Sequence, residues 1–467
     1  MTHYLSKSIK FLIKLYYYME VAMENNEKLK KFLAKKAREA KKKNEKTYIA
    51  TLDEGINRPC KRMLTGLLTL DYLLNGTMEG SLYEISGAEG AGKSTLCWKL
   101  LEKLQYIYPG ISIYYNDIEG TSKDEAFLNR FPLIRRDSVM IDAETYIEDF
   151  FGRLEEMVDI LDVIFVDTVA VLDLKNRVDM EKSEMGKVAG MMTRGWKRFH
   201  DISRNGIRMI AINQLRDNLD PYSPNYGPKT PGGRAYHYAL TGQIGIKRDG
   251  GQSKADKEKD MFGNDKVKAW NTVITIFKNK QGPFGKSINT VLNTTDEEGE
   301  DKFTTFDEVK ELIAFSKVLG FIEEQGRQMY TVYNLIDGTE REKIRGNEAL
   351  EYYIKSNIDV FIELKLNVYR KILSSGFFYS LYDKVLMIAR AEKDMFDIKS
   401  KIDWNKPIQT QLKNIEYTPD KTLEEMKTKY PITIFFTPEE LKSLKEEYGE
   451  PWIWQLRERV DEDEETE

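Results

Sequence analysis

A glycine-rich turn with a single lysine, GAEGAGKS at residues 87–94, has the composition of a phosphate-binding loop. It lies between SLYEIS, an apolar run typical of a strand, and TLCWKLLEKL, a run of helix formers. Backbone N–H groups of such a turn can donate to an anion, and its glycines let the backbone approach a phosphate closely. In a loop of this spacing the lysine reaches the β- and γ-phosphates, while the serine hydroxyl binds Mg²⁺. The sequence therefore predicts a nucleoside triphosphate site formed by Gly87, Ala88, Glu89, Gly90, Ala91, Gly92, Lys93, Ser94 and Thr95.

The chain around this loop alternates between strand-like and helix-forming runs. Strands are predicted at residues 81–86, 111–117, 163–167 and 208–213. This alternation is typical of an α/β fold with a mostly parallel central sheet and helices on both faces. Two further runs, at residues 242–247 and 271–277, lack a long helix between them and are expected to form an antiparallel extension. In an open sheet of this class ligands bind at the carboxyl ends of the strands, so polar residues that end a strand are the candidates for chemistry.

Three of the predicted strands end in such residues. Asp167 ends DVIFVDT, where a carboxylate can hold Mg²⁺ opposite the phosphate loop or can simply cap the strand. Asp117 and Glu119 end YYNDIEG on one face of an extended segment, and Glu119 is the predicted general base for an attacking water; the alternative is a structural carboxylate. Asn213 and Gln214 end RMIAINQ, where an amide can sense the γ-phosphate or merely end a strand. These residues predict a site for nucleotide hydrolysis.

The overall composition limits the class of protein. A chain of 467 residues is long enough for one large α/β domain with smaller flanking parts. Its two cysteines, Cys60 and Cys97, give no disulfide framework and indicate a reducing compartment. The apolar run at residues 11–19 is far shorter than the roughly 20 residues of a membrane helix and lacks a signal-peptide cleavage site. We therefore expect a cytoplasmic protein that does not engage a membrane.

Charge is distributed unevenly, although the net charge is only -5. Residues 1–50 contain 13 Lys and Arg against 5 Asp and Glu, whereas DEDEETE at residues 461–467 contains six acids. Residues 27–46 form a predicted basic helix, which is either a solvated surface element or a docking arm that lays a narrow apolar face on a partner.

The motifs in residues 61–373 follow a familiar order: MLTGLLTLDYLLNG, GAEGAGKST, NDIEG, DVIFVDT, MGKVAGMMTRGWKRF, INQLR, PGG and FKNKQGPF. They resemble the RecA family of homologous-recombination ATPases, including its phage members of the UvsX kind. The later segments GFIEEQGRQMYTVYN and REKIRGNEALEYYIKSN resemble the small C-terminal domain that follows the bacterial core. The resemblance implies a RecA-like P-loop ATPase core that uses ATP and Mg²⁺, in the cytoplasm of a bacterial or phage-infected cell.

The resemblance also assigns roles to single residues. The family's catalytic glutamate matches Glu119, its γ-phosphate sensor matches Gln214, and its lysines that reach the γ-phosphate of a neighbouring subunit match Lys278 and Lys280. With the loop lysine, the expected catalytic set is Lys93, Glu119, Gln214, Lys278 and Lys280, and the expected metal-binding pair is Ser94 and Asp167.

Two segments resemble the DNA-binding loops of the family. Residues 215–233 match the second loop, although an ordinary surface loop would have a similar Pro, Gly and Asn content. The first loop falls within residues 173–185. The implied DNA-binding residues are Met185, Gly186, Arg216, Lys229, Gly232, Gly233 and Arg234, with Tyr222 or Tyr226 available to stack on bases.

Five parts are expected along the chain. A basic arm with an expected oligomerisation helix occupies residues 1–54, the RecA-like core occupies residues 55–295, and a small α/β C-terminal domain occupies residues 296–375. Residues 376–460 form an extra domain without a family match, which is either a packing element or a binding site for another replication protein. Residues 461–467 form an acidic tail, which either competes with DNA for a basic surface or keeps the chain in solution.

These observations predict a DNA-dependent ATPase that polymerises on single-stranded DNA and pairs it with homologous duplex DNA for strand exchange. Base pairing would supply sequence recognition, so basic loops that grip phosphates are expected in place of a base-reading helix. The implied partners are single-stranded DNA, homologous duplex DNA, further copies of the chain in a helical filament, and single-strand-binding and mediator proteins. The alternatives are a hexameric helicase-like motor, which would need a larger domain before the core, and a non-catalytic recombination mediator, which could lose Lys93 or Glu119.

Overall fold

The computed structural model describes residues 62–175, 185–203, 206–215, 230–231, 233–250, 256–259, 263–293, 305–334 and 337–449, together with Lys31 and Lys35. The chain divides into two compact units, residues 1–61 and residues 62–467, and the elements below all belong to the second unit. Apart from Lys31 and Lys35, the predicted basic arm lies outside the described residues, as does the acidic tail.

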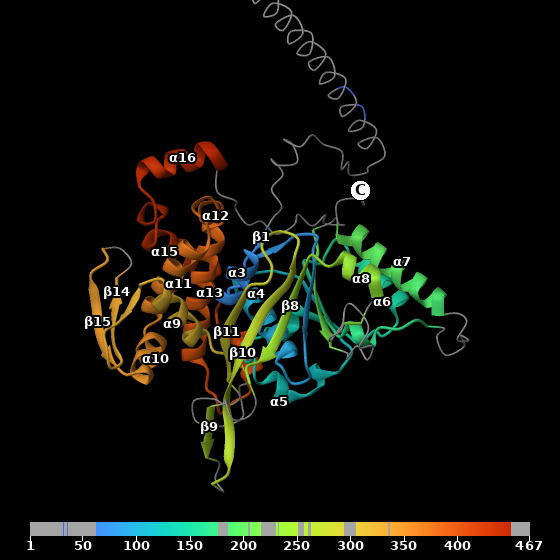
Figure 1. The fold of residues 1–467 in the computed structure, drawn as a ribbon, viewed down its shortest axis with the longest axis horizontal. Helices are drawn as coiled ribbons and strands as arrows, with labels where there is room; N and C mark the ends of the chain where they lie inside the picture. Colours follow the sequence, from blue (N-terminus) through green and yellow to red (C-terminus); the bar gives the residue numbers. More distant parts are fainter. Residues whose placement is uncertain are drawn as a thin grey trace, which may run out of the picture. The chain divides into compact units, whose positions relative to one another are not determined.

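A ten-stranded sheet forms the centre of the described second unit (Figure 1). Its strand order is β12-β11-β10-β8-β3-β7-β6-β4-β5, and β9 pairs with β10 beside this path. The strands are β3 (Leu82–Gly87), β4 (Ile113–Asp117), β5 (Val139–Asp142), β6 (Val163–Asp167), β7 (Arg208–Gln214), β8 (Gly242–Arg248), β9 (Asp256–Lys259), β10 (Asp265–Asn279), β11 (Ser287–Asn293) and β12 (Thr305–Phe306).

Most of this sheet is parallel, as the alternation of strands and helices predicts. β8, β3, β7, β6, β4 and β5 pair in parallel with their neighbours. β10 pairs antiparallel with β8, and β11 and β12 continue the antiparallel extension. The expected antiparallel pairing of residues 242–247 with residues 271–277 is therefore confirmed. The first of these strands has a second role, because its other edge lies parallel to β3 and joins the extension to the parallel core.

Helices cover both faces of the sheet, and the central strands β3, β4 and β6 are buried throughout. One hydrophobic cluster contains residues of α4 (Lys93–Ile107) with Tyr115 and Phe165, and another contains residues of α6 (Ile147–Glu156) and α7 (Met185–Ser203) with Tyr114 and Ile164. Successive strand residues thus point to opposite faces, and a strand buried on both faces has to be apolar at nearly every position. The helices are α3 (Leu68–Leu74), α4 (Lys93–Ile107), α5 (Glu125–Leu128), α6 (Ile147–Glu156), α7 (Met185–Ser203) and α8 (Gly233–Ala239).

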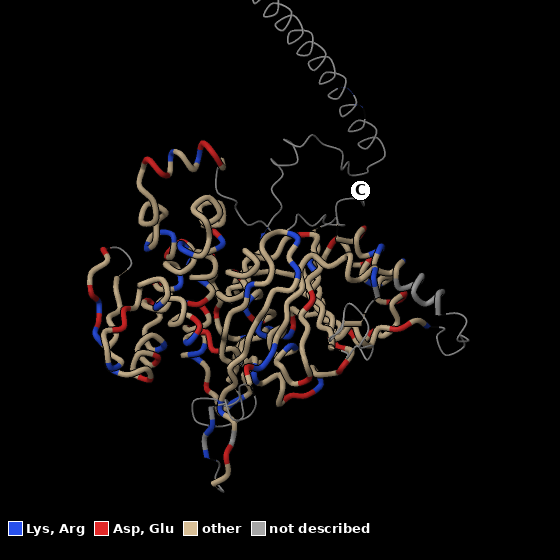
Figure 2. Tube along the Cα trace, viewed as in Figure 1, with Lys and Arg blue, Asp and Glu red and all other residues tan. Residues whose placement is uncertain are grey.

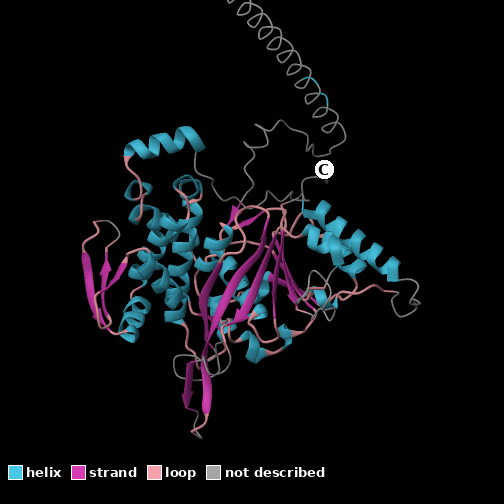
Figure 3. Ribbon diagram, in the orientation of Figure 1, coloured by secondary structure: helices cyan, strands magenta, loops and turns pink. Residues whose placement is uncertain are grey.

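The C-terminal part consists of a small antiparallel sheet and a group of helices (Figure 3). The sheet has the order β13-β14-β15, with β13 (Ile322–Glu324), β14 (Met329–Tyr333) and β15 (Glu340–Arg345). The helices are α9 (Glu308–Val318), α10 (Asn347–Ser356), α11 (Ile358–Ile372), α12 (Ser375–Ser380), α13 (Tyr382–Lys401), α14 (Ile408–Asn414), α15 (Pro419–Lys429) and α16 (Pro438–Tyr448). The longest of them, α13, packs against α11 and α15 and also against α4 of the core.

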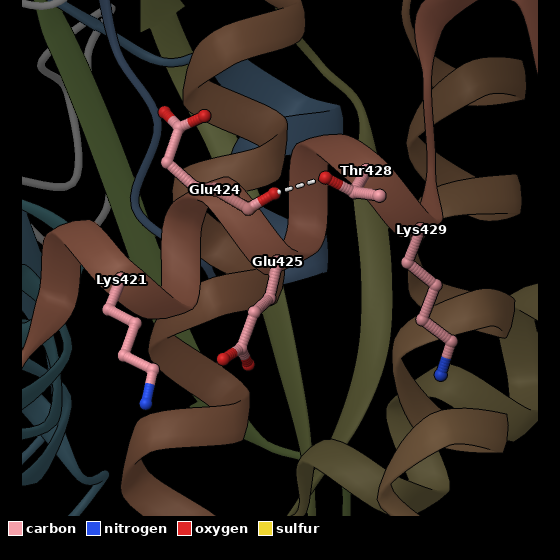
Figure 4. Close-up of a pocket in the computed structure, with 5 residues that line it drawn as sticks. All are labelled: Lys421, Glu424, Glu425, Thr428 and Lys429. Atoms are coloured by element: carbon pink, nitrogen blue, oxygen red, sulfur yellow. Dashed lines mark hydrogen bonds between the residues drawn. The ribbon is translucent and has the colours of Figure 1, made fainter.

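Charges of both signs are interleaved over the described chain, and basic positions follow β8 and β10 (Figure 2). A shallow hollow on α15 is lined by Lys421, Glu424, Glu425, Thr428 and Lys429 (Figure 4). Its Thr428 hydroxyl donates to the Glu424 carbonyl within the same helix at 2.9 Å. This hollow is a solvated helix face of mixed charge. The predicted nucleotide site lies elsewhere, at the carboxyl edge of the main sheet. In the described residues, no helix has the length and apolar character to span a membrane.

Candidate nucleotide site

The phosphate loop joins β3 to α4 at the centre of the sheet. Lys93, the first residue of α4, donates from Nζ to the carbonyl oxygens of Gly87 at 3.1 Å and Ala88 at 2.9 Å. The ammonium group therefore lies over the loop. Burial lowers the pKa of Lys93, and nearby carboxylates, first that of Asp167, oppose this shift. Phosphate oxygens can replace the two carbonyl acceptors and supply the negative charge that favours the protonated lysine.

The glycines of the loop are needed for close approach as well as for backbone conformation. A Cβ atom on Gly87 would lie 2.4 Å from the carbonyl oxygen of Ile246 in β8. Gly92 has a φ of 98°, and a Cβ atom there would lie 2.9 Å from Cδ2 of Leu292 in β11. The β8–β10–β11 extension thus forms a wall against the loop. Because both positions are glycine, no side chain lies between the loop backbone and a bound phosphate.

Asp167 ends β6 beside this loop and has a spare carboxylate oxygen. Tyr115 donates from its hydroxyl to Asp167 Oδ2 at 3.2 Å, whereas the buried Oδ1 has no hydrogen-bond partner among the described residues. Burial raises the pKa of Asp167 to about 6, and the adjacent Ser94 hydroxyl opposes the rise. A free carboxylate oxygen and a hydroxyl are hard oxygen ligands that suit Mg²⁺ or its bound water. Ser94 and Asp167 therefore fit the metal-binding pair that the sequence predicts.

The structure brings Glu119 and Gln214 together. Gln214 Nε2, at the end of β7, donates to Glu119 Oε1 at 3.0 Å. β6 lies between β4 and β7, but the chain after β4 turns back across it, because the Ile118 and Glu119 amides donate to the Asp167 carbonyl at 2.9 and 3.2 Å. A carboxylate and an amide from two strands thus meet beside the acid that ends the strand between them.

Two neighbouring polar residues have structural partners. Asp117 accepts hydrogen bonds from the Thr121 amide, the Thr121 hydroxyl and the Ser122 amide at 2.7–3.0 Å, so it caps the turn after β4. Asn213 donates from Nδ2 to Glu84 Oε2 and to the Pro231 carbonyl, both at 2.8 Å. Asp117 and Asn213 therefore have structural roles, and Glu119 and Gln214 are the residues available for chemistry.

Lys278 lies near the end of β10 and Lys280 directly follows the strand, and both contact α8. Lys278 Nζ donates to the His237 carbonyl, and Lys280 Nζ donates to the Tyr238 carbonyl at 2.7 Å. Carbonyls of the last turn of a helix carry partial negative charge, which attracts cations. Burial, together with the charge of Lys280, lowers the pKa of Lys278. In a single chain both ammonium groups therefore bind α8, and neither is hydrogen-bonded to the phosphate loop.

Comparison with known proteins gives the same family as the motifs. The family model described as the RecA N-terminal domain matches residues 31–293, more than half of the chain. The chain belongs to the RecA family. It is 29% identical over 315 residues to Protein RecA of Malacoplasma penetrans, which covers 66% of this chain and 87% of that protein. It is 26% identical over 321 residues to Protein RecA of Ureaplasma parvum, covering 67% and 86%, and 25% identical over 359 residues to Protein RecA of Legionella pneumophila, covering 74% and 90%.

The DNA-binding residues expected of a RecA-family protein are placed only in part. Arg216, Lys229 and Gly232 lie outside the described residues, as do Tyr222 and Tyr226. Met185 and Gly186 begin α7, Gly233 begins α8, and Arg234 is exposed in the first turn of α8. Both ends of the second loop segment are attached to described elements, because Gln214 ends β7 and the Thr230 carbonyl contacts His237 Nε2 of α8 at 3.1 Å.

Sequence reasoning missed Tyr115 and the wall residues Ile246 and Leu292. Tyr115 lies two residues before Asp117, on the same face of β4, which is the only sequence signal that it faces the nucleotide site. The wall residues have no signal of this kind, since their contact with the loop depends on the pairing of β8, β10 and β11.

Proposed function

We propose that this chain is a DNA-dependent ATPase that polymerises on single-stranded DNA and promotes pairing and strand exchange with homologous duplex DNA. The observation that carries the proposal is the hydrogen bond of Glu119 with Gln214 beside the phosphate loop. The candidate base for hydrolysis thereby contacts the residue from which the candidate DNA-binding loop starts. Membership of the RecA family supports the same assignment.

The nucleotide would be held by the backbone amides of the phosphate loop and by Lys93. Ser94 and Asp167 would hold Mg²⁺, which when bound offsets negative charge on the β- and γ-phosphates. Lys93 would exchange its carbonyl acceptors at Gly87 and Ala88 for phosphate oxygens.

Glu119 would orient a water molecule and accept the proton of that water on Oε1, the carboxylate oxygen that now receives the Gln214 hydrogen bond. The Gln214 amide would turn toward the γ-phosphate and leave that oxygen free for water. Because Gln214 ends β7 and continues directly into residues 215–233, this change would be passed to the DNA-binding segment. DNA ordered on that segment would in turn favour the hydrolytic position of Gln214.

Lys278 and Lys280 would complete the site of a neighbouring copy of the chain. A cation supplied in trans meets charge that develops on the transferred phosphoryl group, and such groups raise the rate by about 10³ to 10⁵. The partners would be single-stranded and duplex DNA, other copies of the chain, and single-strand-binding and mediator proteins of the same cytoplasm.

The decisive experiment is ATP hydrolysis measured with and without single-stranded DNA, alongside Lys93→Ala as the inactive reference. We expect DNA to stimulate hydrolysis by the native chain and not by the variant. A hydrolysis rate that is independent of DNA would contradict the proposal and favour a different ATPase built on the same core.

A further inference from the structure

A positively charged side chain from the antiparallel extension lies directly against the phosphate loop. Arg248, the last residue of β8, donates from Nη2 to the carbonyl oxygen of Gly90. A Cβ atom on Gly90 would lie 3.1 Å from the same nitrogen, and Gly90 has a φ of 66°. Glycine at this position therefore allows the loop to take a left-handed conformation and the guanidinium to reach its backbone.

The guanidinium is held in place by an aromatic ring on the next strand. Its central carbon lies 4.4 Å from the ring centroid of Trp270, a buried residue of β10. Arg248 is paired with Thr272, so Trp270 lies two residues along β10 on the same face of the sheet. The planar guanidinium of arginine stacks on such a ring, which fixes its direction before any ligand arrives. The buried Nε–H has no acceptor among the described residues, so donor capacity remains.

The contact with Gly90 fixes one peptide unit of the loop. The carbonyl of Gly90 and the N–H of Ala91 belong to the same planar group and point in opposite directions. Because Arg248 holds the carbonyl toward β8, the Ala91 N–H is directed away from β8 and toward the interior of the loop. That N–H now donates to the Ala88 carbonyl at 3.2 Å, an acceptor that a phosphate oxygen can replace.

We propose that Arg248 is a positioning residue of the nucleotide site, which aims the Ala91 amide at the polyphosphate of a bound nucleoside triphosphate. This role rests on the proposed function, because it presumes that the loop binds a nucleotide. Arg248 acts through the loop backbone and takes no part in the transfer of a proton. Its orientation depends on the Trp270 ring, so the antiparallel extension contributes to the affinity of the site for nucleotide.

The chain offers a matched control in the preceding residue. Lys247 carries the same charge on the same strand, but it is exposed and points to the opposite face of the sheet. Lys247→Gln therefore removes a positive charge from β8 and leaves the contact between Arg248 and Gly90 in place.

The test is binding of a fluorescent ATP analogue with Mg²⁺ and without DNA, together with steady-state ATP hydrolysis. Arg248→Gln should weaken binding by about 10-fold, since a charged donor to a loop carbonyl is lost. KM for ATP should rise by a similar factor and kcat should fall by less. Arg248→Lys keeps a charged donor but stacks poorly on the ring, so its affinity for the analogue should lie between those of the native chain and Arg248→Gln. Lys247→Gln should bind the analogue as the native chain does.

Native affinity in Arg248→Gln, or an equal loss in Lys247→Gln, would overturn the proposal. If Arg248→Gln does not fold, Arg248→Lys and Trp270→Leu replace it, and native affinity in both of these would overturn it equally. Lys93→Ala, measured in parallel, separates this inference from the proposed function. Native affinity in Lys93→Ala would contradict nucleotide binding by the loop itself, whereas native affinity in Arg248→Gln alone would contradict only the role of Arg248.

Discussion

Asp117 ends β4 and Glu119 lies two residues later in the turn, and their surroundings give them different roles. Asp117 accepts three hydrogen bonds from the turn that follows β4, whereas Glu119 accepts one hydrogen bond from a side-chain amide that can rotate away. A general base must have an oxygen free for water, so the geometry favours Glu119.

We predict that Glu119→Gln keeps Mg²⁺–ATP binding and loses hydrolysis by about 10²-fold or more, because the phosphate cradle survives while the water loses its base. Complexes with DNA should then persist in ATP. Single-turnover hydrolysis measured beside nucleotide binding separates the two effects. Native turnover in this variant would remove Glu119 as the base.

A second carboxylate provides a test of stability against pH. Glu311 of α9 is largely buried and accepts a hydrogen bond from the Thr69 amide at 3.1 Å. Burial raises its pKa from 4.5 to about 7, and the hydrogen bonds from Thr69 oppose the shift. Between these two values the unfolded chain has lost the proton and the folded chain retains it, so the free energy of unfolding should decrease as pH rises from about 4.5 to about 7.

Glu311→Gln keeps the acceptor for Thr69 but cannot ionise. It should therefore raise the free energy of unfolding by roughly 1–3 kcal/mol at pH 8 and change it little at pH 4. Urea unfolding at both pH values measures the difference. Glu425→Gln, at an exposed position of α15, is the control, and an equal gain at pH 8 in both variants would contradict the explanation.

At the residue scale, the sequence predicted side chains that end strands and missed those that depend on pairing between distant strands. Asp167, Glu119 and Gln214 could be predicted because the carboxyl ends of parallel strands share one edge. Arg248 and Trp270 could not, because Arg248 contacts the loop and the Trp270 ring only through the register of β8 and β10.

At the scale of elements, the sequence predicted the buried strands and missed strands that are partly exposed or polar. β3, β4, β6 and β7 are apolar and buried along most of their length, so their existence was clear from sequence. β5 and β11 were not predicted, because β5 is a short, partly exposed edge strand and SINTVLN of β11 is mostly polar without a regular apolar/polar alternation. Charged residues in α13 gave no indication of burial either, since most charged side chains are exposed.

Helix α13 is nevertheless tied to the core by buried charges. Glu392 accepts from Lys103 of α4 at 2.7 and 2.8 Å and from Lys365 of α11 at 2.5 Å. Burial opposes ionisation of Glu392, but Lys103 and Lys365 outweigh it and lower its pKa. Arg390 donates from Nη2 to the carbonyls of Tyr106 and Ile107 at 2.7 and 2.8 Å, which satisfies the C-terminal end of α4. Residues of α13 thus stabilise the helix that begins at the phosphate loop.

We predict that Glu392→Gln lowers the free energy of unfolding by roughly 1–3 kcal/mol, because the buried ammonium groups of Lys103 and Lys365 lose a shared carboxylate and keep only Glu308. Urea unfolding near neutral pH measures the loss. Glu424→Gln removes the same group from an exposed pair with Lys427 on α15 and should cost less than about 1 kcal/mol. Equal costs would contradict a stabilising role for the buried network.

At the scale of the whole molecule, the single chain has a phosphate loop and two lysines that do not serve it. Lys278 and Lys280 are hydrogen-bonded to the end of α8, and α8 begins directly after the segment expected to bind DNA. Movement of α8 on DNA would release the two ammonium groups, and a neighbouring copy aligned on the same DNA would offer them a γ-phosphate. Strand β10 contains Lys278 and Trp270, and Lys280 follows its last residue, so one strand would link the chain's own nucleotide site to that of its neighbour.

We therefore predict that Lys278→Ala combined with Lys280→Ala leaves nucleotide binding by the isolated chain nearly unchanged and abolishes DNA-stimulated hydrolysis, a loss of about 10³-fold or more. Each lysine contributes about 0.3–1 kcal/mol at a helix end, so the fold should survive. Lys286→Ala is the control, because Lys286 lies on the adjoining turn and contacts the Tyr72 ring at 5.0 Å.

Mixing the double variant with Lys93→Ala decides whether the lysines act between subunits. Neither variant is active alone, but a mixed interface pairs an intact phosphate loop from one with intact lysines from the other, so hydrolysis should return in part. If the mixture stays inactive while both variants bind DNA, the lysines act within their own chain. Full DNA-stimulated turnover in the double variant would show that they have no catalytic role.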